Sequence, residues 1–319
     1  MLDNSLIEVR LIATKDEAEG IRSFILAAEN GQLPPFTAGA HLDVCLANGL
    51  IRQYSLFGDP DKNGDYQIAV LREAESRGGS AAMHALTIGD RLLISQPRNL
   101  FPLMENAHKT ILLAGGIGIT PILAMAWRLH HLQQNFELHY CVRTRSRAAF
   151  LQLLKASPFA AHLSTYFDEG EDAQRLKADD IAEPDVNTHL YVCGPVGFMD
   201  YVLHSARSKG WQDSNLHWEY FAPPETDAAP NVPFELEIAS TGQVLLVPAD
   251  HTAWEALDRA GVYVPVSCEQ GICGTCLVNI KLGIPDHRDS YMTDEEHEAN
   301  NQFTPCCSRA KSTRLVLDL

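Results

Sequence analysis

The stretch CEQGICGTC, residues 268–276, decides how the last third of the chain folds. It sets Cys268, Cys273 and Cys276 in a C-x4-C-x2-C pattern. This spacing is typical of plant-type 2Fe–2S clusters, in which four thiolates hold two irons inside a loop that wraps around them. The sequence therefore predicts a 2Fe–2S cluster at this loop.

Two glycines inside the loop fit this interpretation. Gly271 and Gly274 have no Cβ, so they permit unusual backbone angles and leave N–H groups free to donate to sulfur. A fourth thiolate could come from Cys306 or Cys307, and the spacing does not choose between them. The alternative is structural zinc, but zinc sites use paired short knuckles and the chain has no second C-x2-C.

The composition limits the classes of function. The chain has 319 residues, 45% of them hydrophobic, and a formal net charge of −16 from 41 acidic and 25 basic residues. This charge argues against nucleic acid or anionic membranes as partners; it suits a basic protein partner, or serves solubility alone. The start, MLDNSLIEVRLIA, lacks the pattern of a signal peptide. We expect a soluble cytoplasmic protein whose thiols are reduced.

Two breaks in the pattern, at residues 97–109 and 222–233, divide the chain into three domains. Short apolar runs before the first break predict an antiparallel β-barrel. Alternating strand and helix patterns between the breaks predict a doubly wound parallel sheet. The remainder predicts a compact α+β unit. The expected boundaries are 1–104 for the barrel, 105–223 for the parallel sheet, 224–232 for a linker and 233–319 for the α+β unit.

The stretch AGGIGITPI, residues 114–122, predicts a nucleotide-binding turn between a strand and a helix. Gly116 and Gly118 let the backbone approach a pyrophosphate, Thr120 is expected to cap the helix, and Pro121 suits its first position. A plain strand–helix turn is the alternative. A second strand ends in CGP, residues 193–195, and two such ends in one parallel sheet form a crevice of the kind that binds nucleotides.

The stretch RQYSL, residues 52–56, combines residue types that suit a flavin. Arg52 could clamp a phosphate, Tyr54 could lie on the ring and Ser55 could hydrogen-bond its edge. RGGSAAMH, residues 77–84, adds a second phosphate cradle at a helix start. Read alone, each is an ordinary strand or turn. A flavin is nevertheless expected, because a nicotinamide delivers two electrons as hydride and the cluster accepts one at a time.

The order RQYSL, GGIGITP, CGP and CEQGICGTC resembles the phthalate dioxygenase reductase family along essentially the whole chain. These are single-chain reductases of Rieske-type oxygenases. The resemblance implies an FMN-binding barrel, an NADH-binding domain and a plant-type ferredoxin domain of the β-grasp class. It assigns Arg52, Gln53, Tyr54, Ser55, Ala69, Val70, Gly78, Gly79 and Ser80 to FMN, and Gly116, Gly118, Thr120, Cys193, Gly194, Pro195 and Phe221 to the nicotinamide–flavin region. It assigns Cys268, Cys273, Cys276 and Cys306 to the cluster.

The family implies hydride transfer from NADH to FMN, then single electrons through the cluster to a separate Rieske-type oxygenase. The chain itself lacks the paired C-x-H and C-x-x-H of a Rieske protein. We expect a monomer with no acid–base residue. A stand-alone NADH oxidase or ferric reductase, a redox sensor without turnover, and NADPH bound by Arg143, Arg145 and Arg147 remain alternatives.

Two further stretches have open interpretations. TDEEHE, residues 293–298, could face the electron acceptor or form a solvated helix. His287, in PDHRD, is interpreted as a structural or solvated turn histidine without a role in the reaction.

Overall fold

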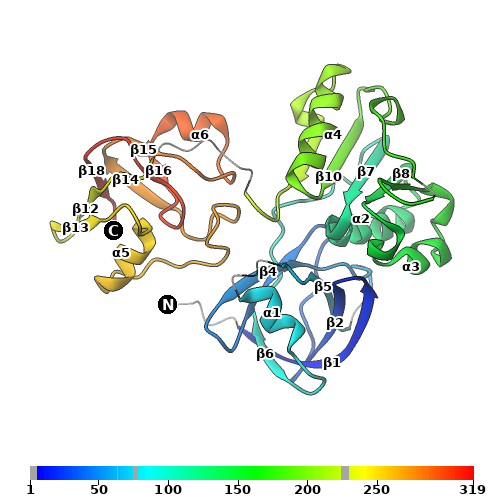
Figure 1. Cartoon of the computed structure of the whole chain (residues 1–319), viewed down its shortest axis with the longest axis horizontal. Helices are drawn as coiled ribbons and strands as arrows, with labels where there is room; N and C mark the ends of the chain where they lie inside the picture. The colour runs from blue at the N-terminus through cyan, green and yellow to red at the C-terminus, as the bar shows by residue number, and fades with distance from the viewer. Residues whose placement is uncertain (1–5, 63, 75, 77, 172, 224–229) are drawn as a thin grey trace. The chain divides into compact units, whose positions relative to one another are not determined.

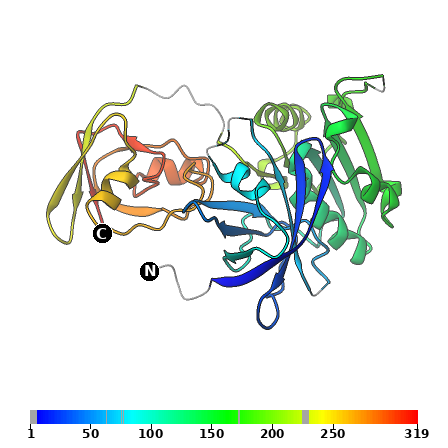
Figure 2. The same cartoon turned by 60° about the horizontal axis from the view of Figure 1, so that its bottom comes forward.

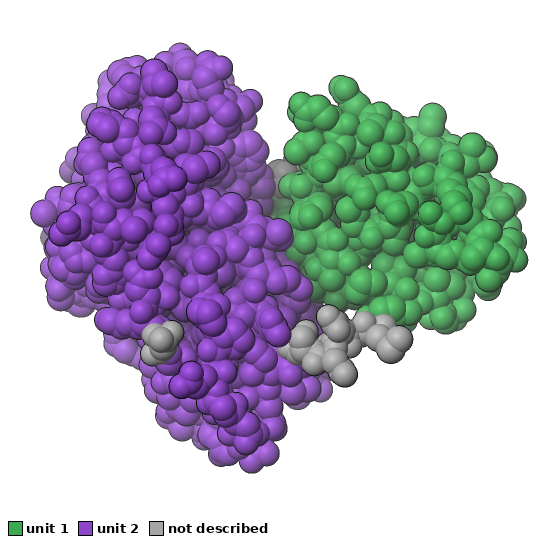
Figure 3. Space-filling model, turned by 180° about the vertical axis from the view of Figure 1, so that it is seen from behind, with its two compact units in different colours: residues 1–4, 222–319 green, residues 5–221 purple. Residues whose placement is uncertain are grey.

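The computed structural model describes residues 6–62, 64–74, 76, 78–171, 173–223 and 230–319 (Figures 1 and 2). The chain divides into two compact units, residues 5–221 and residues 1–4 with 222–319 (Figure 3). Most of the linker predicted over 224–232 lies outside the described residues. The boundary predicted between residues 104 and 105 falls inside the larger unit and stays a prediction.

The N-terminal part of the larger unit is a six-stranded antiparallel sheet in the order β4-β3-β6-β1-β2-β5. A bridge between Leu56 and Ile68 joins its two edges, which makes the sheet a barrel. Alternate residues such as Val9 and Leu11 face a fully buried interior, as the period of two in a strand requires. The elements are β1 Ile7–Ala18, β2 Ile21–Ala28, β3 His41–Cys45, β4 Ile51–Ser55, β5 Tyr66–Leu71, α1 Gly79–His84 and β6 Arg91–Ile94.

The rest of the larger unit is a five-stranded parallel sheet in the order β11-β10-β7-β8-β9. On β7, Leu112 packs with helix α2 while Ile111 and Leu113 pack with α4, so the helices cover both faces. This doubly wound arrangement confirms the predicted class. The elements are β7 Lys109–Gly115, α2 Ile119–His131, β8 Phe136–Val142, α3 Leu151–Ala156, β9 Leu163–Phe167, β10 Thr188–Cys193, α4 Val196–Ser208 and β11 Leu216–Glu219.

The barrel and the parallel sheet share one apolar core. Phe57 and Phe101, from barrel segments, belong to the same buried cluster as Leu123 of α2. Short 3-10 turns connect the elements: η1 Gly116–Gly118, η2 Arg145–Arg147, η3 Ala160–His162, η4 Ala178–Asp180 and η5 Asp213–Asn215. In the described part of the chain, no helix is long and apolar enough to span a bilayer.

The smaller unit contains a mixed five-stranded sheet in the order β13-β12-β18-β14-β16, in which β12 and β18 are parallel. Strands β12 and β13 form a hairpin around residues 241–242, in which Ile238 pairs with Gln243 and Gly242 has a φ of 70°. Helix α5 begins with a capping box formed by Thr252 and Glu255. The elements are β12 Phe234–Ile238, β13 Gln243–Val247, α5 Ala253–Arg259, β14 Val278–Leu282, β15 Pro285–Asp286, α6 Asp294–Ala299, β16 Gln302–Phe303, β17 Arg309–Ala310 and β18 Arg314–Leu317.

Candidate functional site

Four cysteines of the smaller unit form a buried cradle. Cys268, Cys273, Cys276 and Cys306 are each at most 8% exposed. The thiol of Cys268 lies within hydrogen-bonding reach of Cys273 and Cys306, and Cys306 reaches Cys276 in turn. Hydrogen bonds from Cys273 and Cys306 lower the pKa of Cys268, whereas the hydrogen bond to Cys268 raises the pKa of Cys306. Thiols this close cannot all ionise without a cationic centre among them, so the donor set fits an iron–sulfur cluster.

Cys307 lies at the margin of this cradle, where, among the described cysteines, its thiol contacts Cys306 but has neither Cys268 nor Cys276 as its partner. Its Sγ lies 3.4 Å from Thr304 Oγ1 and 3.8 Å from Ser308 Oγ, and a Cβ on Gly271 would come within 2.4 Å of it. Cys306, by contrast, contacts both Cys268 and Cys276. The geometry therefore favours Cys306 as the fourth ligand, which the spacing had left open.

The backbone of the cysteine loop requires its glycines. Gly271 and Gly274 have φ values of 74° and 66°, which side-chain-bearing residues rarely adopt. A Cβ on Gly274 would come within 2.3 Å of the Tyr291 ring. The N–H of Gln270 donates to Cys268 Sγ at 3.3 Å, and such bonds tune the potential of a cluster.

The two strand ends predicted to bind a nucleotide meet at the parallel sheet. A Cβ on Gly118 would lie 2.2 Å from the carbonyl oxygen of Cys193, and one on Gly194 would lie 2.8 Å from Cα of Gly115. Only glycine permits this approach, and Gly116 adds a φ of 53°. The turn after β7 and the end of β10 therefore line one edge of the sheet.

The predicted helix cap at this turn is wrong. Gly118 precedes the first residue of α2, and no side chain caps the helix. Thr120 is 2% exposed and donates to the carbonyl of Ile117 at 3.1 Å. Pro121 is consequently the third helical residue. The chain uses the η1 turn to enter α2, so the hydroxyl serves that turn.

The residues predicted to hold the flavin phosphate come together in the barrel. A Cβ on Gly79 would lie 2.8 Å from Cγ of Arg52, so the arginine of β4 lies directly over the start of α1. Gly78 precedes that helix with a φ of 96°. The N–H of Glu73 donates to Ser80 Oγ at 3.1 Å. These contacts bring one cation and a glycine turn into a single cradle.

The remaining predicted flavin residues line neighbouring strands. Tyr54 is largely buried, and that burial raises its pKa. Ala69 and Val70 are buried on β5, where the carbonyl of Val70 binds His84 Nε2 at 2.9 Å. Gln53 instead turns its side chain to Asp43, with 3.1 Å between Nε2 and Oδ1.

The sequence reasoning missed an acidic residue at this site. Glu219 ends β11 and pairs in register with Cys193 of β10. Its carboxylate accepts a hydrogen bond from Ser55 and lies 4.0 Å from Nδ1 of His41. Burial raises the pKa of Glu219 to about 8, so the carboxyl group is largely protonated at neutral pH. No local sequence motif includes Glu219, because its neighbours Ser55 and His41 come from strands that are far away in the sequence.

Comparisons with known proteins match this architecture. Residues 112–204 match the model of the oxidoreductase NAD-binding domain, and residues 236–311 that of the 2Fe-2S iron–sulfur cluster binding domain. The solved structure of a phthalate dioxygenase reductase is 36% identical, covers 99% of both chains and superposes with a TM-score of 0.79. This chain belongs to the phthalate dioxygenase reductase family. Its cofactors are accordingly FMN, NADH and a 2Fe–2S cluster, and it is an electron-transfer oxidoreductase.

Relatives of this reductase include components of several oxygenase systems. A vanillate O-demethylase oxidoreductase from Pseudomonas sp. is 54% identical over 98% of this chain and 100% of its own length. A phenoxybenzoate dioxygenase subunit beta from Ectopseudomonas oleovorans is 40% identical over 98% of this chain and 97% of its own.

The three arginines that follow β8 all make contacts within the larger unit. Arg143 donates to Glu169 at 2.8 Å, Arg147 lies 3.8 Å from Glu19, and Arg145 lies over the Phe167 ring. Two of the three arginines are therefore paired with carboxylates of the same unit. Phe221 is 36% exposed and follows Glu219 by two residues; its place beside the flavin stays a prediction.

Proposed function

We propose that this chain passes electrons from NADH to a separate Rieske-type oxygenase that removes the methyl group of a methoxylated aromatic acid of the vanillate type. The 54% identity to a vanillate O-demethylase oxidoreductase over its whole length supports this choice of acceptor. The observation that carries the proposal is that one chain holds both a nucleotide crevice at the ends of β7 and β10 and a four-cysteine cradle.

The residues of the larger unit bind and orient the two nucleotides. Bound FMN and the bound cluster supply the redox chemistry, since a flavin accepts a hydride and a cluster carries one electron at a time. Around them, Arg52 neutralises phosphate charge, and Ser55 presents its hydroxyl at the junction with Glu219. Gly118 and Gly194 let the two strand ends approach each other and so shape the edge at which a pyrophosphate would bind. The proposed nucleotide-binding set is Arg52, Gln53, Tyr54, Ser55, Ala69, Val70, Gly78, Gly79, Ser80, Gly116, Gly118, Thr120, Cys193, Gly194, Pro195 and Phe221.

The residues of the smaller unit hold the cluster. We propose Cys268, Cys273, Cys276 and Cys306 as its four ligands. All four cysteines are buried, and the N–H of Gln270 donates to the sulfur of Cys268. The loop therefore keeps water away from the four sulfurs. The thiols must be deprotonated to bind, so the cluster and the fold of the loop support each other.

The test is reconstitution with a purified vanillate-type oxygenase. The wild-type reductase should support demethylation coupled to NADH oxidation. A Cys306→Ser variant should still show bleaching of the flavin band by NADH but no demethylation. Reduction of ferricyanide does not discriminate, because a stand-alone reductase would also perform it. Rapid NADH oxidation without any transfer to the oxygenase would favour the stand-alone alternative.

We also propose that the acidic helix α6 docks the oxygenase. Asp294 and Glu295 are exposed, whereas Glu296 accepts from the N–H of Thr293 in a capping box and should be left intact. Reversing two of the exposed charges of this helix, with Asp294→Lys and Glu295→Lys, should slow electron transfer to the oxygenase and leave flavin reduction unchanged. The matched control is Asp258→Lys on α5, an exposed acid of the same unit. Equal rates in all three proteins would exclude this docking surface.

We infer that the chain works as a cytoplasmic monomer. A reducing compartment keeps the cysteines available to a cluster. Light scattering of the loaded protein should return a mass close to 35.2 kDa, the mass of one chain. A dimer mass that persists on dilution would contradict the monomer.

A further inference from the structure

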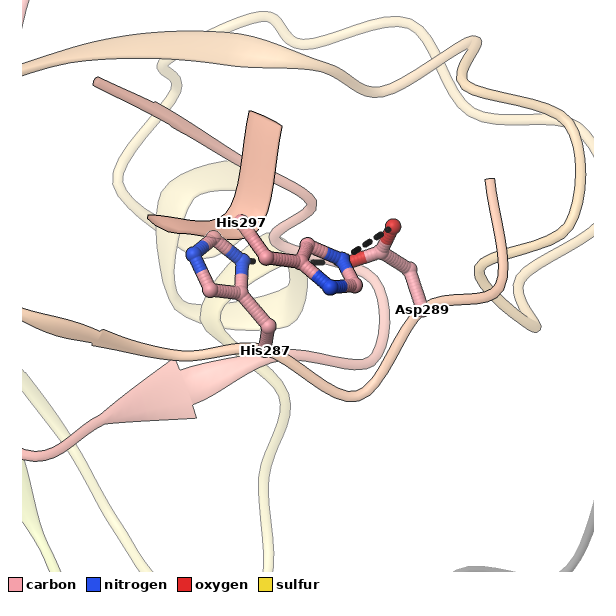
Figure 4. Close-up of side chains that lie close together, drawn as sticks. All are labelled: His287, Asp289 and His297. Atoms are coloured by element: carbon pink, nitrogen blue, oxygen red, sulfur yellow. Dashed lines mark hydrogen bonds and ion pairs between the residues drawn. The ribbon is translucent and has the colours of Figure 1, made fainter. Parts of the chain in front are cut away.

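Two histidines and an aspartate meet in the smaller unit, outside the four-cysteine cradle (Figure 4). His287 follows β15, Asp289 lies in the next turn, and His297 comes from α6. The imidazole rings stack with centroids 4.4 Å apart and an interplanar angle of 21°. One nitrogen of each ring lies within 4 Å of the Asp289 carboxylate.

His287 is buried, although its two ring nitrogens make no well-formed hydrogen bond. Its side chain is 9% exposed, Nδ1 lies 3.9 Å from the Asp289 carboxylate and the ring contacts the backbone of His297, but neither nitrogen makes a well-formed hydrogen bond among the described residues. A buried polar group without a partner is costly, so such a group calls for an explanation. Of the two interpretations of His287, structural or solvated, its burial agrees with a structural residue. A ligand for its nitrogens would account for its placement.

The donor atoms are spaced as a small cation requires. His297 Nε2 lies 3.3 Å from Asp289 Oδ2, and His287 Nδ1 lies 3.9 Å from Asp289 Oδ1. One ligand atom from each residue falls within 4.8 Å of the others. Zinc bonds of about 2.0–2.2 Å in a tetrahedral arrangement put ligand atoms about 3.3–3.6 Å apart. Binding also requires one imidazole to rotate out of the stack, because a metal lies in the plane of each ring that binds it.

The carboxylate is held in place by a second layer of donors. Asp289 Oδ2 accepts from the N–H of Met292 at 2.9 Å, and Oδ1 lies 3.2 Å from Thr304 Oγ1 and 3.4 Å from Ser308 Oγ. Such outer bonds orient metal ligands.

We propose that His287, Asp289 and His297 bind one divalent cation of the zinc class, at a site distinct from the iron–sulfur cluster. Two imidazoles and one carboxylate suit zinc, whereas calcium and magnesium prefer oxygen alone. A water molecule fills the fourth position. Through Asp289, the ion ties α6 to Thr304 and Ser308, which flank the proposed ligand Cys306. Its role is to stabilise the ferredoxin fold around the cluster.

The experiment is equilibrium dialysis of the flavin- and cluster-loaded protein against Zn²⁺, with zinc and iron measured together by mass spectrometry. Wild-type protein should take up one more zinc ion per chain than a His287→Gln/His297→Gln variant, at unchanged iron content. The single variant His297→Gln should weaken binding at least about tenfold. Zinc should raise the unfolding temperature of the wild-type smaller unit and leave that of the double variant unchanged.

The matched control is His108→Gln/His204→Gln, which removes two exposed imidazoles from the larger unit. It should bind zinc as the wild type does. Equal zinc uptake by the wild type and the His287→Gln/His297→Gln variant would overturn the proposal, as would loss of iron in step with zinc uptake. The wild-type measurement stands alone if the double variant does not fold: loaded wild-type protein that takes up no zinc refutes the site.

Discussion

Glu219 should make the larger unit less stable as pH rises. The perturbation is Glu219→Gln, which keeps the shape of the side chain and removes its titration. Burial raises the pKa of this carboxyl from an ordinary value of 4.5 to about 8 in the folded chain. The folded state therefore binds a proton that the unfolded state releases between these values. Stability is highest below pH 4.5 and is lost progressively up to about pH 8.

The magnitude follows from the two pKa values. One pKa unit corresponds to about 1.36 kcal/mol, so the whole rise is worth at most about 5 kcal/mol. Between pH 5 and pH 7, linkage gives a loss of about 2–3 kcal/mol, with the side chain 16% exposed and thus weakly screened. The Glu219→Gln variant should lack this loss and unfold with a flatter pH dependence.

The assay is urea unfolding at a series of pH values, with FMN at a fixed excess and its fluorescence as the probe of the barrel. Glu29→Gln provides the control, because the hydrogen bond with Arg10 lowers the pKa of Glu29 and its titration lies below this range. Identical pH slopes for wild type and Glu219→Gln between pH 5 and pH 7 would refute the reasoning.

Two further substitutions test the other sites. Gly118→Ala would place a Cβ 2.2 Å from the carbonyl oxygen of Cys193, so KM for NADH should rise several-fold and the free energy of unfolding should fall by about 1–3 kcal/mol. The control is Gly197→Ala, which has no atom within 4 Å of the added Cβ and should change neither quantity appreciably. An unchanged KM in Gly118→Ala would exclude the crevice. Cys306→Ser should abolish the iron–sulfur absorption while Cys307→Ser keeps it; the reverse outcome would exchange the two ligands.

Local motifs could be predicted from the sequence because their chemistry and their backbone geometry lie in adjacent residues. The C-x4-C-x2-C spacing and the Gly116–Gly118 turn are of this kind. Glu219 could not be found this way, because its neighbours Ser55 and His41 come from strands more than 150 residues earlier in the chain.

The wrong helix cap at Thr120 has a similar cause. A hydroxyl before an apolar run is typical of a cap, but the η1 turn shifted the helix start, and the same hydroxyl bonds Ile117. The choice between Cys306 and Cys307 likewise required the structure, because adjacent cysteines fit the same sequence spacing and differ only in the contacts that their thiols make.

Strand β18 lies at the centre of the smaller sheet, between β12 and β14, although it follows every other strand of that unit in the order of synthesis. A ribosome therefore delivers all of the cysteines before the strand that joins the two halves of the sheet. The sheet closes only once Arg314–Leu317 is in place, so the apolar core that Cys276 and Cys306 share with Leu315 and Leu317 forms late.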